Sequence, residues 1–354
     1  MPNSPTTASE ALSAGVAGQR AGIAVVIPAY RVTRHIEDVV SRVGGEVDAI
    51  YIVDDTCPDG SGDYAEANIS DPRVRVLRNP KNLGVGGAVL NGLAQAYSDG
   101  FLIGVKIDGD GQMDPAILYR FVDPILGGRA DYTKGNRFFD PRSLHKMPRG
   151  RLFGNALLSF AAKFSTGYWN LFDPTNGYVA LDLRLLPYLS PERVARRYFF
   201  ETDLLFRANL VRARVLDIPM RAVYEDETSH LSAFREGPKF LAGHARNFFK
   251  RLAYSYFIRD FSLASVELVV GTLCILFGIG VAVPSLLTPE PESAGTVMLA
   301  SLPIFTGILL LLGAVNYDIR STPDTAIASR LPEVGGLDPL EATTAEDEAY
   351  AQTS

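Results

Sequence analysis

The stretch FLIGVKIDGDGQMDP, residues 101–115, joins an apolar run to a cluster of carboxylates, and it decides the fold class of this chain. The run FLIGVKID (101–108) has the composition of a buried strand. Asp108 and Asp110 lie two positions apart at its end, and side chains with that spacing in an extended segment point the same way. Carboxylate oxygens suit Mg²⁺ or Mn²⁺, and Gln112 adds an amide oxygen. The stretch therefore predicts a divalent-metal site at a strand end, with a plain polar turn as the alternative.

Asp114, near the end of the same stretch, has a different predicted role. It stands directly before Pro115. Aspartate is a preferred N-cap residue, and proline is favoured in the first turn of a helix. We therefore expect Asp114 to cap the next helix and not to join the metal site.

Three more apolar runs precede this stretch, and each predicts a strand. Helical spacing marks residues 34–43 and 86–100. Strands that alternate with helices imply βαβ units and a parallel sheet, whose ligands bind beyond the carboxyl ends of the strands. The predicted fold class is therefore α/β, with a crevice at those ends. The three runs are GIAVVIP (22–28), DAIYIVDD (48–55) and VRVLRN (74–79).

The composition excludes several classes of protein. The 354 residues carry a net charge of −6, which argues against nucleic acid as the main partner. Two cysteines, Cys57 and Cys274, are too few for a disulfide framework, so the globular part is expected to face the cytosol. The four histidines are scattered without the spacing of a zinc site.

Two apolar runs in the last third, residues 261–283 and 297–316, are long enough to span a bilayer. The first contains one charged residue, Glu267. The loop between them, residues 284–296, has acidic residues and no Lys or Arg, whereas basic residues precede the first run. The positive-inside rule then predicts a multi-pass protein of the cell (inner or plasma) membrane, with both termini and the globular part in the cytoplasm. A buried helical hairpin in a soluble protein is the alternative.

Two further segments combine apolar and basic residues. Residues 144–165 place aromatic and aliphatic side chains on one helical face and add positive charges such as Arg151 and Lys163. This pattern is typical of a helix in the interface of an anionic leaflet, although packing on the domain core explains it as well. Residues 236–260 repeat the pattern and lead straight into the first apolar run.

The remaining segments complete the expected division into domains. Residues 1–20 lack a basic region followed by an apolar one, so we expect a disordered leader and not a signal peptide. Residues 317–354 are acidic and rich in Ala and Thr, which predicts a disordered cytoplasmic tail. Residues 21–235 form the expected globular domain.

Four motifs, in this order along the chain, carry a resemblance to a known family: VVIPAY, IVDDTCPDGS, NLGVGGA and IDGDGQMDP. Together they resemble the nucleotide-sugar-binding half of inverting GT-A glycosyltransferases. The chain as a whole, over about residues 22–320, resembles the polyprenyl-phosphate glycosyltransferases, the group of dolichyl-phosphate mannose synthase and its bacterial undecaprenyl-phosphate relatives. The resemblance implies a GT-A (Rossmann-like) domain with amphipathic interfacial helices and two C-terminal transmembrane helices.

The same resemblance assigns donor-binding roles. It implies that Pro28, Tyr30 and Asp55 line the pocket for the base and ribose of a nucleotide sugar. It further implies that the FLIGVKIDGDGQMDP stretch, residues 101–115, holds Mg²⁺ or Mn²⁺ together with the donor diphosphate. The metal ligands would be Asp108, Asp110 and Gln112, with Asp110 also counted as catalytic.

For the acceptor, the resemblance implies that arginines meet a phosphate. Arg137 of the GNRF segment and Arg151 of the basic helix are the candidates, with Arg149 as an alternative to Arg151. Asp173 of DPTNGY corresponds to a catalytic or acceptor-orienting acid of the family. A helix in FETDLLFR is expected to bring two more acids beside the crevice, Glu201 and Asp203.

The chain departs from the family pattern at several places. Arg31, Val32 and Thr33 stand where relatives often have Asn and Glu, which removes one expected contact to the nucleotide. The single tryptophan, Trp169 in GYWNLF, does not match the Gln-x-x-Arg-Trp motif of polymer-forming relatives, which argues against a processive synthase. The glycines of GVGGA (84–88) do not follow the first strand, so they do not predict a dinucleotide site; they are expected to allow close approach of the donor or of the sheet.

The expected reaction is transfer of one sugar, with inversion, from a UDP- or GDP-sugar to a polyprenyl (undecaprenyl or dolichyl) phosphate. The product would serve cell-envelope glycans or protein glycosylation, and the family also implies homo-oligomers. A phosphate acceptor is largely dianionic at neutral pH, because its second pKa lies near about 6, and it needs no strong general base. One alternative is transfer to a sugar hydroxyl of a lipid-linked glycan, which requires a true base. The other is a catalytically silent membrane scaffold of the same fold.

Overall fold

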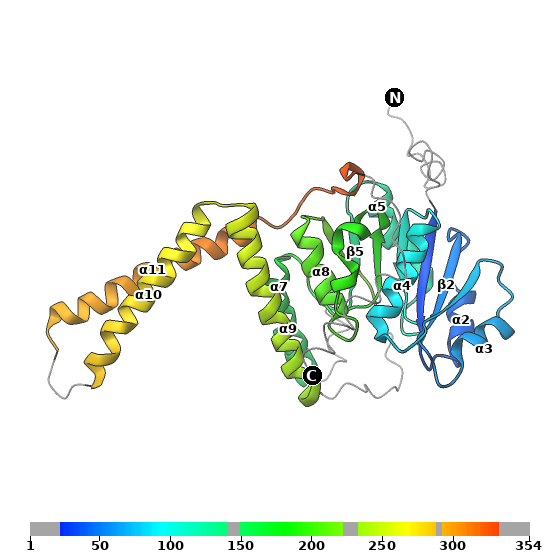
Figure 1. Cartoon of the computed structure of the whole chain (residues 1–354), viewed down its shortest axis with the longest axis horizontal. Helices are drawn as coiled ribbons and strands as arrows, with labels where there is room; N and C mark the ends of the chain where they lie inside the picture. The colour runs from blue at the N-terminus through cyan, green and yellow to red at the C-terminus, as the bar shows by residue number, and fades with distance from the viewer. Residues whose placement is uncertain (1–21, 140–148, 222–232, 288–291, 333–354) are drawn as a thin grey trace, which may run out of the picture. The chain divides into compact units, whose positions relative to one another are not determined.

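The computed structural model describes residues 22–139, 149–221, 233–287 and 292–332, and these fall into two compact units (Figure 1). One unit, the α/β unit, comprises residues 1–245 and 323–354, and the other, the hairpin unit, comprises residues 246–322. The leader expected at residues 1–20 lies outside the described residues. So do residues 144–148 of the expected interfacial helix, 288–291 of the expected loop, and the tail from residue 333.

The α/β unit is built on a seven-stranded sheet in the order β3-β2-β1-β4-β6-β5-β7 within the described residues. The four strands predicted from the sequence are confirmed as β1 to β4. Their predicted parallel pairing is confirmed as well, and β6, a strand that the sequence analysis did not predict, runs antiparallel to both β4 and β5. The strands are β1 (Ile23–Ala29), β2 (Ala49–Asp54), β3 (Val74–Arg78), β4 (Ile103–Lys106), β5 (Tyr132–Asn136), β6 (Val179–Asp182) and β7 (Val215–Pro219).

Helices cover both faces of this sheet, as the alternation of side chains along β1 requires. Ala24 and Val26 face a core formed with α4 (Gly84–Ser98), α8 (Phe200–Leu210) and the 3₁₀ segment η2 (Leu183–Leu189). Val25 and Ile27 face the opposite core, formed with α2, α3 and α5. The result is a three-layer α/β/α arrangement (Figure 1). The three helices of the second layer are α2 (Ile36–Ser41), α3 (Ser61–Asn68) and α5 (Leu118–Leu126).

The antiparallel strand brings a loop to the functional edge of the sheet. Val179 pairs with Lys106 of β4 on one side and with Lys134 of β5 on the other. The C-terminal ends of β4 and β5 therefore lie at the same level, about 10 Å apart across β6. Because β6 runs the other way, the segment that enters it, residues 173–178, arrives at the edge where β4 and β5 end.

Aspartate 114 caps the turn after the metal-site stretch, as predicted. Its side chain accepts a hydrogen bond from the backbone N–H of Ala116 at 3.2 Å. Pro115 occupies the first turn of the 3₁₀ segment η1 (Pro115–Ile117), which leads directly into α5.

The helix expected at residues 144–165 is α7 (Arg149–Thr166). Phe153, Leu157 and Phe160 are more than half exposed along it, at the spacing of one helical face. Lys163 does not add charge to that face, which corrects the sequence interpretation. Its ammonium donates hydrogen bonds to the carbonyl oxygens of Trp169 and Leu171, the second at 2.7 Å.

The basic segment expected at residues 236–260 begins with α9 (Ala233–Ala253). His244 of this helix is buried against α7, and its Nδ1 lies 2.8 Å from the hydroxyl of Ser165. Burial lowers the pKa of His244 to about 4. Leu241, on the same helix, is 68% exposed. The helix gives way to a π-helical turn, η4 (Tyr254–Arg259), within the hairpin unit.

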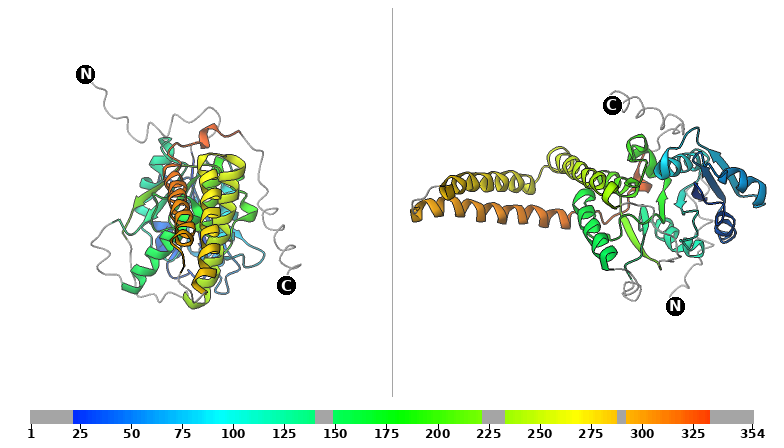
Figure 2. Two further views of the ribbon diagram at one scale, coloured as in Figure 1. Left: turned by 90° about the vertical axis from the view of Figure 1, so that its left-hand side faces the viewer. Right: turned by 90° about the horizontal axis from the view of Figure 1, so that it is seen from below.

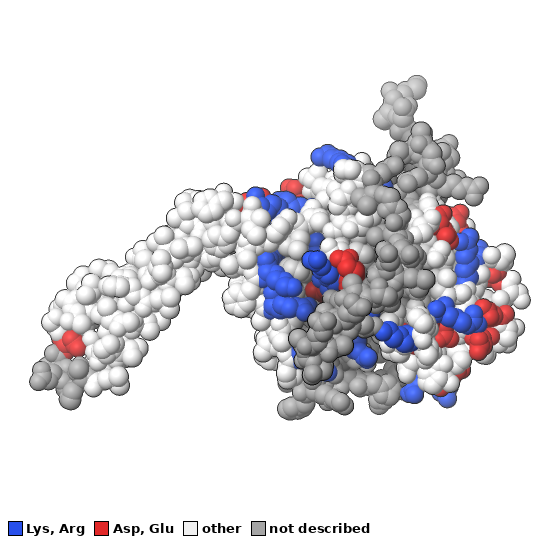
Figure 3. All heavy atoms as spheres, viewed as in Figure 1, with Lys and Arg blue, Asp and Glu red and all other residues white. Residues whose placement is uncertain are grey.

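Two long helices make up most of the hairpin unit: α10 (Leu263–Leu287) and α11 (Ala294–Arg320) lie side by side (Figure 2). Both have the length and hydropathy needed to cross a membrane. Small residues let them approach closely, because a Cβ on Gly278 would lie 2.6 Å from the carbonyl oxygen of Ala300. Seen from one side, the described part of the pair is almost wholly uncharged along its length (Figure 3).

The hairpin unit contains a cluster of buried polar contacts. At its base, the guanidinium of Arg251 donates two hydrogen bonds to the carboxylate of Asp318, at 2.7 and 2.9 Å. Tyr256 donates a third to the same carboxylate at 2.9 Å. Glu267, the charge noted in the first apolar run, faces α11, since a Cβ on Gly313 would lie 2.9 Å from its Oε2.

The tail expected from residue 317 is ordered further than composition predicted. Helix α11 continues to Arg320, and residues 323–332 belong to the α/β unit. There the buried carboxylate of Asp131 accepts hydrogen bonds from the backbone N–H groups of Ile327 (2.8 Å) and Ala328 (2.7 Å). A buried carboxylate that needs donors thus fixes a segment whose own sequence looks disordered.

Candidate active site

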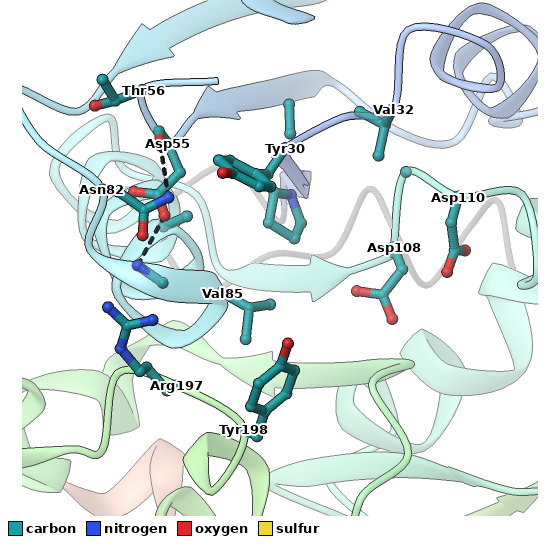
Figure 4. A pocket seen from close by; sticks show the side chains of 15 residues that line it. Tyr30, Val32, Asp55, Thr56, Asn82, Val85, Asp108, Asp110, Arg197 and Tyr198 are labelled. Carbon is teal, nitrogen blue, oxygen red and sulfur yellow. Dashed lines mark hydrogen bonds between the residues drawn. The ribbon is translucent and has the colours of Figure 1, made fainter. Parts of the chain in front are cut away.

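A cavity of about 570 Å³ lies at the C-terminal ends of β1, β2 and β4 (Figure 4). Five of the residues predicted from the sequence line it together: Pro28, Tyr30, Asp55, Asp108 and Asp110. They come from strand ends that are far apart in the chain, as expected for the crevice of an α/β sheet. The remaining lining residues are Ala29, Val32, Thr56, Asn82, Gly84, Val85, Ala88, Gly109, Arg197 and Tyr198.

Asp55 is buried at the base of the cavity and organises the start of α4. Its Oδ1 accepts hydrogen bonds from the side chain of Asn79 (2.7 Å) and from the N–H of Leu83 (2.8 Å). Its Oδ2 accepts one from the N–H of Gly84 at 2.7 Å. The side chain of Asn82 donates to the backbone carbonyl of Asp55 at 3.1 Å (Figure 4). Asp55 therefore holds this wall of the cavity in place as well as facing it.

Asp108 faces the cavity and is held from behind by a buried lysine. The ammonium of Lys106 lies 2.8 Å from Asp108 Oδ1 and 3.3 Å from Oε1 of Glu201, on the first turn of α8. Burial alone would lower the pKa of Lys106, but attraction to Asp108 and Glu201 outweighs it and leaves the pKa raised, so the lysine stays charged. Burial raises the pKa of Glu201, an effect that Lys106 only partly offsets.

Asp110 sits on a tight turn next to Asp108. Its Oδ1 accepts a hydrogen bond from the backbone N–H of Gln112 at 3.0 Å. Gly111 between them has a φ of +81°, a conformation that favours glycine. Gln112 does not line the cavity, and it contacts Asp110 through its backbone N–H.

The carboxylate oxygens that face the cavity suit a hard divalent cation. Such a cation would take its remaining ligands from a bound substrate. Asp108 and Asp110 offer carboxylate oxygens to the same cavity (Figure 4). Among the described residues, no cluster of three or more His, Cys, Asp and Glu side chains is arranged to hold a metal. Mg²⁺ is commonly held by one or two carboxylates plus substrate phosphates, so a two-carboxylate site suits a cation that arrives with a diphosphate.

Arg137 and Asp173 form a bidentate ion pair beyond the end of β5. The guanidinium donates from Nε to Asp173 Oδ2 and from Nη2 to Oδ1, both at 2.7 Å. Asp173 is buried and adopts a φ of +55°, and the side chain of Asn176 donates to it at 3.1 Å. Although burial alone would raise it, the pKa of Asp173 is lowered by Arg137. Neither partner lines the cavity described above.

One glycine of the same loop joins the two sides of the site. A Cβ on Gly177 would overlap the ammonium of Lys106 and lie 2.6 Å from Asp108 Oδ2. The DPTNGY segment thus holds Asp173 at its start and packs its glycine against the carboxylate of Asp108. This explains in physical terms why an acid and a glycine stand four positions apart.

The other predicted residues are placed away from the cavity or outside the description. Asp203 is fully buried, and its Oδ2 accepts hydrogen bonds from the N–H of Ala195 (2.9 Å) and from Arg207 (3.3 Å). Neither Asp203 nor Glu201 lines the cavity. Arg149 and Arg151 lie in the first turn of α7, and their side chains lie outside the described set.

Sequence reasoning missed the wall formed by Arg197 and Tyr198. These residues precede α8 and face the start of α4 across the cavity (Figure 4). The glycines of GVGGA were the sequence signal for this wall. Gly86 donates its N–H to the carbonyl of Arg196 at 2.8 Å, and a Cβ on Gly84 would lie 2.7 Å from that oxygen. Gly84 and Gly86 therefore admit the 195–197 segment, a contact that the sequence analysis did not predict.

A mixed α/β sheet with acidic strand ends around one cavity is the architecture of a GT-A nucleotide-sugar-binding domain. Residues 24–188 match the family described as glycosyl transferase family 2. Over 201 residues the chain is 30% identical to a polyprenol monophosphomannose synthase from Mycolicibacterium smegmatis, covering 55% of this chain and 75% of that protein. Over 218 residues it is 29% identical to a UDP-N-acetylglucosamine–dolichyl-phosphate N-acetylglucosaminyltransferase from Methanococcus voltae, covering 58% and 86%.

A solved structure supports the fold. Glucosyl-3-phosphoglycerate synthase from Mycobacterium tuberculosis, in complex with Mn²⁺, uridine diphosphate and glucosyl-3-phosphoglycerate, aligns with a TM-score of 0.50 and 20% identity. The alignment covers 74% of this chain and 88% of that one. The chain belongs to glycosyl transferase family 2, and the protein is a glycosyltransferase. The resemblance and the GT-A fold expected from the four motifs are thereby confirmed.

Proposed function

We propose that this enzyme transfers one sugar, with inversion, from a UDP- or GDP-sugar to a polyprenyl phosphate. The proposal rests on the ends of β4 and β5, where the more exposed side chains carry opposite charges. At the end of β4, the side chain of Asp108 is 27% exposed and that of Lys106 is 1% exposed. After β5, the side chain of Arg137 is 29% exposed and that of Asp173 is 2% exposed. The first arrangement suits a metal-bound diphosphate, and the second suits a phosphate acceptor.

The names of the relatives support the same reaction class. One acts on dolichyl phosphate with UDP-N-acetylglucosamine, and the other makes polyprenol monophosphomannose. The proposed product is a polyprenyl-phosphate-linked monosaccharide for cell-envelope glycans or protein glycosylation. The sugar itself is left to experiment.

In the donor site, Pro28, Tyr30 and Asp55 would hold the base and ribose. Asp108 and Asp110 would hold Mg²⁺ or Mn²⁺ against the diphosphate, with Gln112 supporting Asp110 through its backbone. The cation would supply Lewis-acid stabilisation of the charge that develops on the leaving diphosphate. Mn²⁺ is bound together with uridine diphosphate in the solved glucosyl-3-phosphoglycerate synthase, which supports the choice of cation.

In the acceptor site, Arg137 would hold the lipid phosphate, and Arg151 of α7 would assist. A guanidinium binds phosphate oxygens through parallel hydrogen bonds. A phosphate oxygen then forms the new bond to the anomeric carbon while the bond from that carbon to the donor diphosphate breaks. Asp173 would orient Arg137 for this contact.

Transfer to a sugar hydroxyl is the less favoured alternative. A hydroxyl acceptor requires a general base within hydrogen-bonding reach. Asp173 has a lowered pKa and both of its oxygens bond Arg137, so it is a poor base. Because neither Glu201 nor Asp203 lines the cavity, they are poorly placed to replace it.

The hairpin unit would anchor the enzyme beside its lipid substrate. Helices α10 and α11 would cross the inner or plasma membrane, with both chain termini in the cytoplasm. The exposed apolar stripe on α7 would rest against the cytoplasmic leaflet. Homo-oligomers form part of the proposal, and size measurement in detergent tests them.

The decisive experiment offers the purified protein Mg²⁺ or Mn²⁺, undecaprenyl phosphate and a panel of UDP- and GDP-sugars, and weighs the lipid product. We expect a mass increase of one sugar residue with one donor of the panel. Undecaprenol, which lacks the phosphate, is the matched acceptor control and should give no product. Transfer to a lipid-linked glycan with none to undecaprenyl phosphate would contradict the proposal.

A further inference from the structure

A lysine buried beside the proposed metal site has no place in the mechanism so far. Lys106 is the last residue of β4, and its backbone is fixed on both sides, by pairing with Val26 of β1 and Val179 of β6. It stands two positions before Asp108, so both side chains leave the strand on the same side. A buried lysine in the middle of a sheet is rare unless it is paired.

Three separate elements close around the ammonium of Lys106. From the end of β4, Asp108 Oδ1 lies 2.8 Å away. From the first turn of α8, Glu201 Oε1 lies 3.3 Å away. From the loop that enters β6, Gly177 packs so tightly that an added Cβ would overlap the ammonium. The cation is therefore held at a fixed position by parts of the chain that are distant in sequence.

Lys106 cannot itself reach a ligand in the cavity. Its side chain is 1% exposed, and it does not line the cavity, whereas Asp108 does. Any influence on the donor must therefore pass through the Asp108 carboxylate. Glu201 does not line the cavity either. The arrangement is a buried support behind one exposed carboxylate.

We propose that Lys106, held by Glu201, is a positioning residue that fixes the Asp108 carboxylate for the metal-bound diphosphate of the donor. The inference rests on the proposed function, because it assumes that Asp108 meets a metal and a diphosphate. Partners that orient metal-ligating groups change metal affinity by about 10- to 100-fold when they are removed. Lys106 would act in this way without touching the metal, the nucleotide or the sugar.

The test replaces the buried pair without changing the net charge of the site. In Lys106→Met/Glu201→Met one positive and one negative charge leave together, and side chains of similar length fill the space. Apolar replacement of a whole buried ion pair commonly leaves the fold intact. Binding of Mn²⁺ with UDP, and in parallel with GDP, is measured by calorimetry, and free Mn²⁺ by electron paramagnetic resonance. We expect nucleotide affinity in the presence of Mn²⁺ to fall by about 10- to 100-fold, with an unfolding midpoint close to that of wild type.

Two further variants separate positioning from a general structural effect. In an Asp108→Asn background, the same double replacement should change nucleotide affinity little further, because the carboxylate it positions is already gone. A merely structural role would instead lower affinity by the same factor in both backgrounds. Glu201→Gln alone keeps Lys106 beside Asp108 and should weaken binding less than the double replacement.

If Lys106→Met/Glu201→Met does not fold, Gly177→Ala decides the question. It removes no charge, but its methyl group would displace the ammonium and Asp108, so the same loss of Mn²⁺-dependent nucleotide binding is expected. Unchanged binding in the variant that folds would overturn the role of Lys106 alone. Wild-type protein that binds neither nucleotide with Mn²⁺ would overturn the proposed function, and this inference with it.

Discussion

The ends of β4 and β5 carry the same two charges in opposite arrangements. At β4 the carboxylate of Asp108 is partly exposed and its lysine is buried, whereas at β5 Arg137 is partly exposed and its carboxylate is buried. The basic residues of the two pairs differ accordingly. Lysine is a compact point charge suited to support a group from behind, and arginine is a planar fork that can bond a buried carboxylate while presenting donors elsewhere.

A third ion pair differs from both strand-end pairs, because both of its side chains are buried. In the hairpin unit, the side chains of Arg251 and Asp318 are 4% and 9% exposed, so both charges are hidden. Such a pair offers nothing to a ligand and serves the fold. We interpret the more exposed member of each strand-end pair as the group that meets a ligand, and the predictions below test that interpretation.

The largest expected effect comes from the exposed carboxylates at β4. Asp110→Asn removes a proposed metal ligand without emptying space, so we expect sugar transfer to fall by about 10³-fold or more while the protein still folds. Turnover with saturating donor and the thermal unfolding midpoint are the measurements. Asp114→Asn is the matched control, because asparagine also serves as an N-cap, and it should keep near-normal turnover. Near-normal turnover in Asp110→Asn would remove the metal assignment.

The exposed cation at β5 is expected to control the lipid and not the nucleotide. Arg137→Lys keeps the charge but loses the bidentate geometry, so we expect the KM for polyprenyl phosphate to rise by about tenfold, with little change in the KM for the nucleotide sugar. Steady-state kinetics with each substrate varied in turn provides the measurement. Arg137→Ala should in addition destabilise the fold by about 3–5 kcal/mol, because Asp173 is left buried without its partner. Equal changes in both KM values would contradict the division between the two strand ends.

The hidden pair of the hairpin unit is expected to affect stability alone. Arg251→Met leaves Asp318 buried without its cation and should lower the free energy of unfolding by about 3–5 kcal/mol. Arg251→Met/Asp318→Leu should recover most of that loss. Unfolding midpoints in detergent, compared with the KM values of both substrates in the folded fraction, are the measurements. A selective rise in the KM for the lipid would show that this pair also meets a ligand.

The smallest expected effect is a loss of folding stability in acid, and it originates in the scaffold and not in the candidate site. His244 has a pKa of about 4 in the folded protein, below the ordinary 6.5, so the unfolded chain binds more protons between these values. Stability is therefore full above about pH 6.5 and is lost as the pH falls, by about 2 kcal/mol at pH 5. The unfolding midpoint of wild type should drop between pH 7 and 5, and that of His244→Gln should drop less. Equal drops of the unfolding midpoint in the two proteins would exclude His244 as the source of the acid sensitivity.

Local patterns predicted the donor half of the molecule well. Strands β1, β2 and β4 are apolar runs with acidic or aromatic residues at or after their ends, so these strands and five of the cavity residues could be inferred. The acceptor half gave weaker signals. Strand β5 reads YTKGN and contains the buried Lys134, whose charge is neutralised by Asp217 at 3.0 Å, a partner 83 positions away. No pattern within one segment could reveal that pairing, or the antiparallel direction of β6.

The site shows the same division. Asp108 and Asp110 were found because their spacing indicates a shared direction, other strand ends point to the same crevice, and their stretch resembles a family motif. The support from Lys106 and Glu201, the pairing of Arg137 with Asp173, and the wall at Arg197 all depend on contacts between distant segments. Charged residues inside strands, which sequence analysis passes over, were the available signs of these contacts.

The return of residues 323–332 to the α/β unit has a consequence for biosynthesis. Asp131 receives two of its backbone hydrogen bonds from Ile327 and Ala328, which the ribosome makes only after both long apolar helices. The globular domain therefore cannot complete its own contacts until the hairpin has been synthesised. Folding of the α/β unit is thus coupled by chain order to synthesis of the hairpin, and a nascent chain that stops at residue 322 leaves the buried carboxylate of Asp131 short of two donors.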